Sequence, residues 1–200
     1  MEILIKKMKQ DYDSLHPVSE ELYHLLSRHL IVRRYRKGDV IKPVYQEERA
    51  SRYICRGHVG VYFEQSQGLA LGYVGRETDT VFDMVSYSGE LKSNIEIRAI
   101  SEVVILEFPK ENEQLVVKRY PDFAQLGILI NHRIQERMSQ QMTILRSPML
   151  EGYPKFCQLF PGIEDLLHYQ DWADLFATST RTVGRVFTEL AKGNHEQSST

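Results

Sequence analysis

The chain has 200 residues, of which 42% are hydrophobic and 26% are charged, and its formal net charge is −2. This balance is typical of a packed globular protein, and it excludes a mostly disordered chain and a surface that is basic throughout. No segment approaches the roughly 20 apolar residues of a membrane span, and residues 1–7 are not typical of a signal peptide. Because Cys55 and Cys157 are too few for a disulfide scaffold or a metal cluster, we expect a cytoplasmic protein with no metal and no membrane partner.

The first predicted elements are one helix and a set of strands. Leucines recur at helical spacing between Ser19 and Leu30, and Ser19 is a good N-cap. Eight short runs rich in β-branched and aromatic residues follow, separated by turn residues such as Gly38-Asp39. The runs cover residues 31–35, 40–45, 52–55, 59–63, 69–74, 80–85, 95–100 and 103–108. Their spacing predicts a small antiparallel β-barrel or jelly roll, so we expect a sensor-type domain over residues 1–120 in an α+β protein.

The spacing of apolar residues becomes helical over residues 121–146. Apolar side chains form one stripe on steps of three and four, namely Phe123, Leu126, Ile130, Ile134, Met138, Met142 and Leu145. Such a stripe is typical of a two-helix seam, so it predicts a dimerisation helix in a parallel homodimer. The alternative is that the stripe packs on the barrel of its own chain.

A separate C-terminal unit is predicted over residues 147–193. Ser147-Pro148 ends the long helix, because proline lacks an amide donor. Helices are then expected over residues 149–159, 162–166, 169–177 and 180–192. Residues 194–200 are expected to be a disordered tail.

Residues 169–190 predict a helix, a tight turn and a second helix. Trp172, Leu175 and Phe176 form the buried face of the first helix, and Val183, Val186, Phe187 and Leu190 form that of the second. Arginine at the outer face can donate two hydrogen bonds to guanine, and hydroxyl groups and the helix N-terminus can hold phosphates. The candidate DNA-binding residues, with Ser179 as N-cap, are Ser179, Thr180, Arg181, Thr182, Gly184 and Arg185.

The segment Thr182-Val183-Gly184-Arg185-Val186, with Ala173 nine residues before Thr182, resembles the helix-turn-helix of the Crp/Fnr family of bacterial regulators. Gly38-Asp39-Val40-Ile41 and residues 53–62 are similar to that family's cyclic-nucleotide-binding-type barrel. The resemblance implies a homodimeric, sequence-specific transcription regulator. Its implied partners are double-stranded DNA, a small-molecule effector and RNA polymerase.

The resemblance also places a candidate effector pocket at Phe82, Asp83, Gly89, Glu90, Lys92 and Ser93. In the family, a Phe-Gly-Glu turn holds the ribose and an Arg-Ser or Arg-Thr pair clamps the phosphate. This chain has Phe82-Asp83-Met84 and Lys92-Ser93 instead, and lysine cannot reproduce the planar fork of arginine. We therefore expect a different effector or none, rather than a cyclic nucleotide, and no cofactor is identified.

Two departures keep a second function open. Relatives commonly carry Arg-Glu where this chain has Thr180-Arg181, so the operator is expected to differ. Asp171, Asp174 and Glu189 also offset the nearby positive charges. The alternative is a small-molecule-binding or protein-interaction module with a degenerate helix-turn-helix. An enzyme is not expected, because no nucleophile elbow, phosphate loop or metal-binding motif is present.

Overall fold

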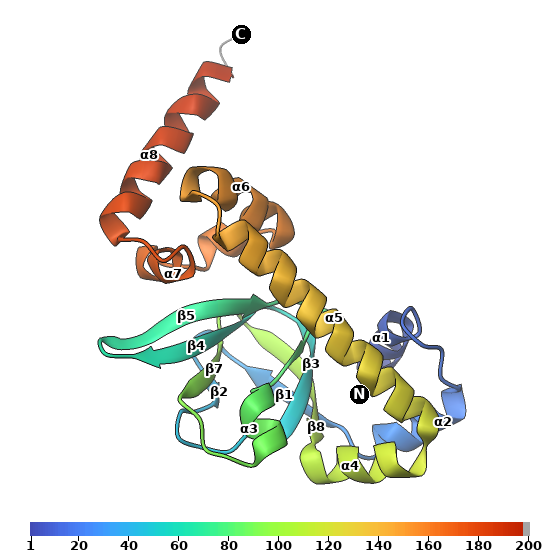
Figure 1. Cartoon of the computed structure of the whole chain (residues 1–200). Coiled ribbons are helices and arrows are strands. Elements are labelled where there is room, and N and C mark those ends of the chain that lie inside the picture. Colours follow the sequence, from blue (N-terminus) through green and yellow to red (C-terminus); the bar gives the residue numbers. More distant parts are fainter. Residues whose placement is uncertain (198–200) are drawn as a thin grey trace.

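Two short helices open the chain and pack against the barrel. The computed structural model describes residues 1–197, which Figure 1 shows coloured along the sequence. Helix α1 (Glu2–Tyr12), which is not among the predicted elements, buries Met8 and Tyr12. Helix α2 (Glu20–Ser27) begins as predicted, because the Ser19 side chain accepts a hydrogen bond from the Leu22 amide at 3.4 Å.

Eight strands follow, and they form two four-stranded sheets with antiparallel pairing. The strand order is β1-β8-β3-β6 in one sheet and β2-β7-β4-β5 in the other. The strands are β1 (Ile31–Tyr35), β2 (Val40–Lys42), β3 (Ala50–Arg56), β4 (Val59–Gln65), β5 (Gly68–Gly75), β6 (Thr80–Val81), β7 (Ile95–Ala99) and β8 (Val103–Pro109). Fully buried aliphatic side chains, including Ile54, Ile97 and Ile105, fill the space between the sheets. The predicted β-barrel is thus confirmed.

One predicted strand is much shorter than expected. The pattern predicts a strand over residues 80–85, but β6 ends at Val81 and helix α3 (Met84–Gly89) begins soon after. Asp83 ends the strand because its carboxylate accepts a hydrogen bond from the Ser86 amide at 3.2 Å and caps this helix.

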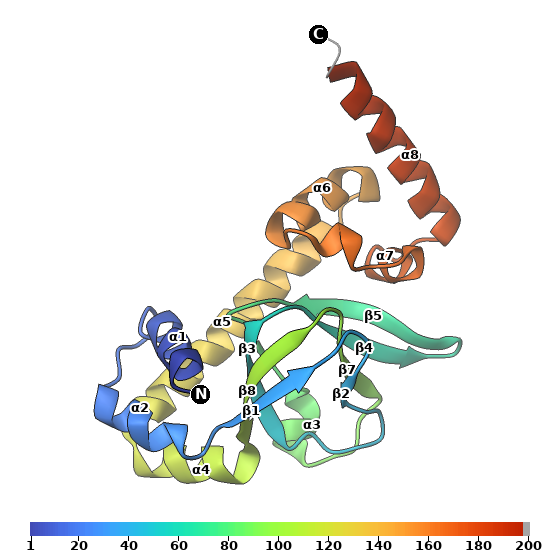
Figure 2. The ribbon, with the colours of Figure 1, turned by 180° about the vertical axis from the view of Figure 1, so that it is seen from behind.

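The long predicted helix is present with almost the expected bounds. Helix α4 (Lys110–Arg119) leads into α5 (Pro121–Leu145), which begins at a proline whose missing amide costs nothing at a first helical position. In Figure 2, α5 runs from the N-terminal helices, past the barrel, to the C-terminal helices. The helix therefore connects the N-terminal helices and the barrel to the C-terminal helices.

One face of α5 is held by its own chain. Phe123 and Leu126 are buried among Tyr23 and Leu26 of α2, so these two residues of the predicted dimer stripe are covered within the protomer. Arg133 donates to Asp11 at 3.0 Å, Arg137 pairs with Asp79, and Gln141 bonds to the backbone of Val74. The basic excess that the sequence shows along this helix is therefore used in part to fix it to the barrel.

Four helical elements complete the fold, close to the predicted positions. They are α6 (Met149–Leu159), a short 3₁₀ helix η1 (Ile163–Asp165), α7 (Tyr169–Leu175) and α8 (Thr180–Gln197). Helix α8 continues five residues beyond the expected end at Lys192, so residues 194–197 of the expected tail are helical, and the tail residues 198–200 lie outside the described residues. Within the described part of the chain, no helix is long and apolar enough to span a bilayer.

Candidate nucleic-acid interface

The turn between α7 and α8 is fixed by backbone and side-chain hydrogen bonds. Ala177 adopts a left-handed conformation with φ of 48°, and the Thr178 amide then donates to the Ala173 carbonyl at 2.8 Å. The Ser179 hydroxyl accepts from the Thr182 amide at 3.2 Å and lies 3.0 Å from the Thr182 hydroxyl. Ser179 is thus the predicted N-cap of α8, and the chain reverses within four residues.

An aromatic cluster holds α8 at a fixed angle on the rest of the C-terminal unit. Trp172 is 1% exposed, and its ring lies 4.8 Å from that of Tyr153 and 5.5 Å from that of Phe156, measured between centroids. Val183 and Val186 of α8 are buried in the same cluster. The predicted inner faces of both helices are therefore confirmed, and α8 cannot rotate without disturbing this core.

The outer face of α8 is polar and accessible over its first two turns. Thr180, Arg181 and Arg185 are exposed, and the structure brings them together near the N-terminus of the helix, where the amide groups also point outward. Thr182 is half-buried because its hydroxyl lies against Ser179. These positions agree with a helix face that could read a duplex groove.

Gly184 is the exception among the predicted outward positions. A Cβ atom there would lie 3.6 Å from the ring of Tyr169, so Gly184 faces this aromatic side chain and is half-buried. Tyr169 packs edge-on against Phe187 at 5.2 Å and remains 52% exposed. Sequence reasoning missed Tyr169, although its place outside the buried stripe of α7 is a signal that could have identified it.

Two of the three acidic residues near α8 are engaged away from its outer face. The Asp171 carboxylate accepts from the His168 amide at 2.8 Å at the start of α7. One oxygen of Asp174 accepts from the Leu71 amide of β5 at 3.2 Å, and the other accepts from Gln170 at 2.7 Å. In both Figure 1 and Figure 2, α7 lies beside β5 while α8 extends away from the barrel. Asp171 and Asp174 are therefore engaged away from Arg181 and Arg185, whereas Glu189 is exposed on α8 one helical turn after Arg185.

No protein-family model matches the sequence, and the comparison with curated proteins finds no relative. Solved structures do match. CLP, a c-di-GMP-responsive global regulator of Xanthomonas campestris, has a TM-score of 0.67 at 16% identity, with 88% of this chain and 93% of that chain covered. FixK2 from Bradyrhizobium japonicum has a TM-score of 0.66 at 15% identity, with 82% and 86% covered.

A third match names the fold. A transcriptional regulator assigned to the Crp/Fnr family from Eubacterium rectale has a TM-score of 0.68 at 14% identity, with 88% of this chain and 85% of that chain covered. The chain has the Crp/Fnr fold. The resemblance to this family was based on residues 182–186 and on two segments of the barrel, residues 38–41 and 53–62. The fold that this resemblance implies is therefore confirmed.

Within this Crp/Fnr fold, α5 carries a second apolar face that its own chain does not cover. Ile128 is 52% exposed, Met138 is 38% exposed and Met142 is 49% exposed. Ile128 and Met142 are fourteen residues apart, or two heptads, with Met138 one helical turn before Met142. The predicted Ile130, Ile134 and Leu145 are half-buried and border this face. The exposed stripe thus differs from the predicted one at its N-terminal end, where Ile128 takes the place of Phe123 and Leu126.

The six residues of the candidate effector pocket do not converge in this Crp/Fnr barrel. Phe82 packs on Tyr87 with a centroid separation of 5.1 Å, Glu90 pairs with Lys110 at 2.9 Å, and Gly89 and Lys92 are exposed. Only Asp83 and Ser93 are in contact, through a hydrogen bond between their side chains. A residue outside the predicted set, Lys42 of β2, joins them.

Lys42 forms a buried ion pair with Asp83. Its ammonium group lies 3.1 Å from the Asp83 carboxylate, 2.5 Å from the Ser93 hydroxyl and 2.8 Å from the Ile95 carbonyl, so each of its three protons has a partner. Burial raises the pKa of Asp83, but hydrogen bonds from Ser93 and Ser86 and the charge of Lys42 outweigh burial and hold this pKa below its usual value. A phosphate could bond to Lys42 only by displacing one of these three partners.

The groups that could bind a metal or react with a thiol-specific reagent are dispersed. Among residues 1–197, no three side chains of His, Cys, Asp or Glu are grouped so as to hold a metal ion. Burial raises the pKa of Cys55 and of Cys157 to about 11, so both thiols stay protonated at neutral pH. Burial and the charge of Arg76 lower the pKa of His58, whose ring packs on Phe160. These residues are part of the packed structure.

Proposed function

We propose that the protein is a sequence-specific DNA-binding transcription regulator that acts as a homodimer. One observation carries this proposal: Thr180, Arg181 and Arg185 are exposed together on the first two turns of a helix whose opposite face is fully packed. The N-terminal half of the second helix of a helix-turn-helix is the part that enters the major groove. Arg185 is then placed to donate two hydrogen bonds to guanine, while Thr180 and the helix N-terminus hold phosphates.

The homodimer part of the proposal rests on α5. Exposed apolar side chains at Ile128, Met138 and Met142 lie on heptad-like steps of a 25-residue helix, and a second copy of the same helix would cover them. A two-fold arrangement of two α8 helices matches two half-sites about one helical turn, or 34–36 Å, apart. A symmetric operator is therefore expected.

The first experiment is selection of bound duplexes from a random pool with the full-length protein, followed by a salt titration on the selected site. We expect enrichment of a two-fold-symmetric sequence. We also expect the logarithm of affinity to fall steeply with the logarithm of salt concentration, because several phosphates are neutralised. A pool that stays random, together with weak and salt-insensitive association, would overturn the proposal and favour a protein-interaction module.

A further inference from the structure

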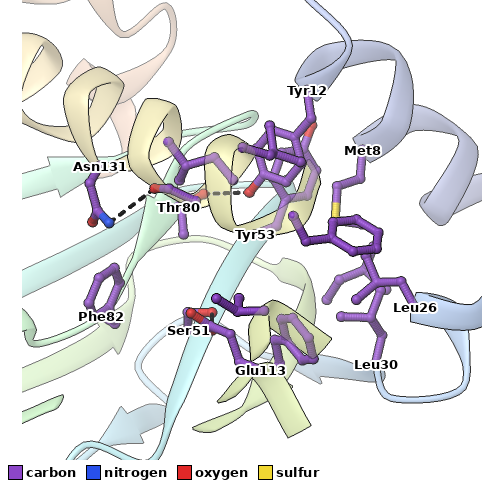
Figure 3. Close-up of a pocket in the computed structure, with 17 residues that line it drawn as sticks. Met8, Tyr12, Leu26, Leu30, Ser51, Tyr53, Thr80, Phe82, Glu113 and Asn131 are labelled. Atoms are coloured by element: carbon purple, nitrogen blue, oxygen red, sulfur yellow. Dashed lines mark hydrogen bonds between the residues drawn. The ribbon is translucent and has the colours of Figure 1, made fainter. Parts of the chain in front are cut away.

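A cavity lies between the outer face of the β3/β8 sheet and the helices that cover it. Its volume is about 110 Å³, and Figure 3 shows the side chains around it. One side of the cavity is lined by Met8 of α1, by Leu26 of α2 and by Leu30, which follows α2. Phe82 and Asn131 lie on the opposite side of the cavity. The cavity is separate from the interior of the barrel, because successive side chains of β3 and β8 point alternately toward the covering helices and toward the space between the two sheets.

The walls of the cavity are mostly apolar, and some of the lining side chains are aromatic. Tyr53, Phe82, Phe108 and Phe123 line it together with aliphatic side chains, and no lysine, arginine or histidine does so. An engineered apolar cavity of about 150 Å³ in another protein stays dry and binds benzene. The space here is somewhat smaller, so it can hold at most one single-ring molecule and is too small for a nucleotide.

Hydrogen-bonding side chains also line the cavity, and Glu113 supplies the carboxyl group among them. The Glu113 carboxyl lies against the cavity, and the Ser51 hydroxyl donates to it at 2.5 Å. Burial raises the pKa of Glu113, although hydrogen bonds from Ser51 and Tyr87 oppose the shift. This carboxyl can accept a hydrogen bond from a ligand hydroxyl, and it would repel a ligand carboxylate. The chemistry of the wall thus disfavours an anionic ligand.

A glycine on α5 keeps the space open. A Cβ atom added at Gly127 would have no neighbour within 4 Å, so packing does not demand a glycine there. Glycine in the interior of a helix is less favourable than alanine, and this one lies within the 25 residues of α5. Gly127 is also a lining residue of the cavity, so a side chain at this position would enter it.

We propose that this cavity binds a small uncharged aromatic molecule with one hydroxyl group, of the size of a phenol, with its ring among Phe82, Phe123 and Leu126 and its hydroxyl at Glu113. Five of the lining residues belong to α5, which also bears the exposed stripe of Ile128, Met138 and Met142. The ligand would therefore contact the helix that is proposed to form the dimer. Binding itself does not rest on the DNA-binding proposal, since it is measured without DNA.

The test is calorimetric titration of phenol into the full-length protein, compared with toluene and benzoate. We expect saturable 1:1 binding of phenol, at least fivefold weaker binding of toluene, and none of benzoate. Gly127→Leu fills the space and should weaken phenol binding at least tenfold, whereas Gln125→Leu, on the exposed side of the same helix, should leave it unchanged. Circular dichroism of both variants checks that they are folded.

A second, milder variant keeps the test decisive if Gly127→Leu does not fold. Gly127→Ala suits a helix better and adds one methyl group to the cavity, so it should fold well and bind phenol several-fold more weakly. Phenol that fails to bind the unmodified protein would overturn the proposal. So would phenol that binds Gly127→Ala and Gln125→Leu equally, or benzoate that binds as well as phenol.

Discussion

Gln141 on α5 and Val74 on β5 are joined by two hydrogen bonds between a side chain and a strand backbone. The Val74 amide donates to the Gln141 side-chain carbonyl at 2.9 Å, and the Gln141 amide donates to the Val74 carbonyl at 3.0 Å. β5 is an edge strand, so this side chain takes the place of a neighbouring strand. Both residues are almost fully buried. The pair fixes the position of α5 along the barrel at the end nearest the C-terminal helices.

Gln141→Leu should destabilise the protein by roughly 2–4 kcal/mol, because it leaves a buried amide and a buried carbonyl without partners. The free energy of unfolding in urea measures the loss. Gln140→Leu, at the exposed neighbouring position, is the matched control and should change stability by less than about 0.5 kcal/mol. Equal effects of the two variants would contradict the role of the pair.

The elements that could be predicted best are those indicated by residues close together in the sequence. Ser19 and Ser179 cap the helices expected to follow them, because each side chain bonds to an amide three residues ahead. β1 has the predicted bounds, and the short apolar runs between turn residues correspond to the other strands. Helix α1 was missed although Leu4, Met8 and Tyr12 recur on steps of four, which is helical spacing.

The faces of α5 could not be assigned from the pattern alone. Successive steps of four residues, from Leu126 to Met142, advance about 40° each beyond a full turn. The predicted stripe therefore winds from the face that its own chain covers to the exposed one. The Lys42–Asp83 pair joins residues 41 positions apart, and no local signal indicates such a contact.

Asp83→Asn should destabilise the protein by about 3–5 kcal/mol at neutral pH, because it leaves the buried Lys42 ammonium without a counter-charge. The pKa of Asp83 is lowered in the folded state, so its contribution is present above the ordinary aspartate pKa and is lost as the pH falls through the folded value. Urea unfolding between pH 7 and pH 3 should therefore show a steeper acid decline for the unmodified protein than for Asp83→Asn.

The matched control replaces both charges by apolar groups. Lys42→Met combined with Asp83→Leu leaves no buried charge and should recover much of the stability that Asp83→Asn loses. A double variant as unstable as Asp83→Asn would show that the pair does not account for the loss.

Glu113→Gln should increase stability at neutral pH. Burial raises the pKa of Glu113, so the folded protein binds this proton more tightly than the unfolded chain, and the ionised carboxylate destabilises the fold at pH 7. Glutamine keeps an acceptor for the Ser51 hydroxyl without the charge. The gain should appear in urea unfolding at pH 7 and shrink as the pH falls below the ordinary glutamate pKa, where the carboxyl becomes protonated in both states. A gain of the same size at pH 7 and below that pKa would contradict this explanation.

Met142→Glu should convert the proposed dimer to a monomer, because it places a carboxylate in the apolar seam opposite the same residue of a second copy. Sedimentation velocity across a concentration series measures the change. Thr143→Glu adds the same charge one residue along, at an exposed position on another side of the helix, and should leave the association unchanged. A Met142→Glu protein that sediments as the unmodified protein does would place the dimer contact elsewhere.

Arg185→Ala should weaken binding to the selected operator by about 1–3 kcal/mol and relax the preference at one base pair of each half-site, because a bidentate contact to guanine is lost. Lys192→Ala is the matched control. It removes the same charge from the same side of α8, about two turns further along and beyond the half that enters the groove. Its effect should be smaller, uniform across sequences and visible as a reduced salt slope. Affinity measured for the operator and for single-base variants separates the two changes. If both variants weaken all sequences equally, Arg185 contacts phosphate and α8 does not read the base pairs through this residue.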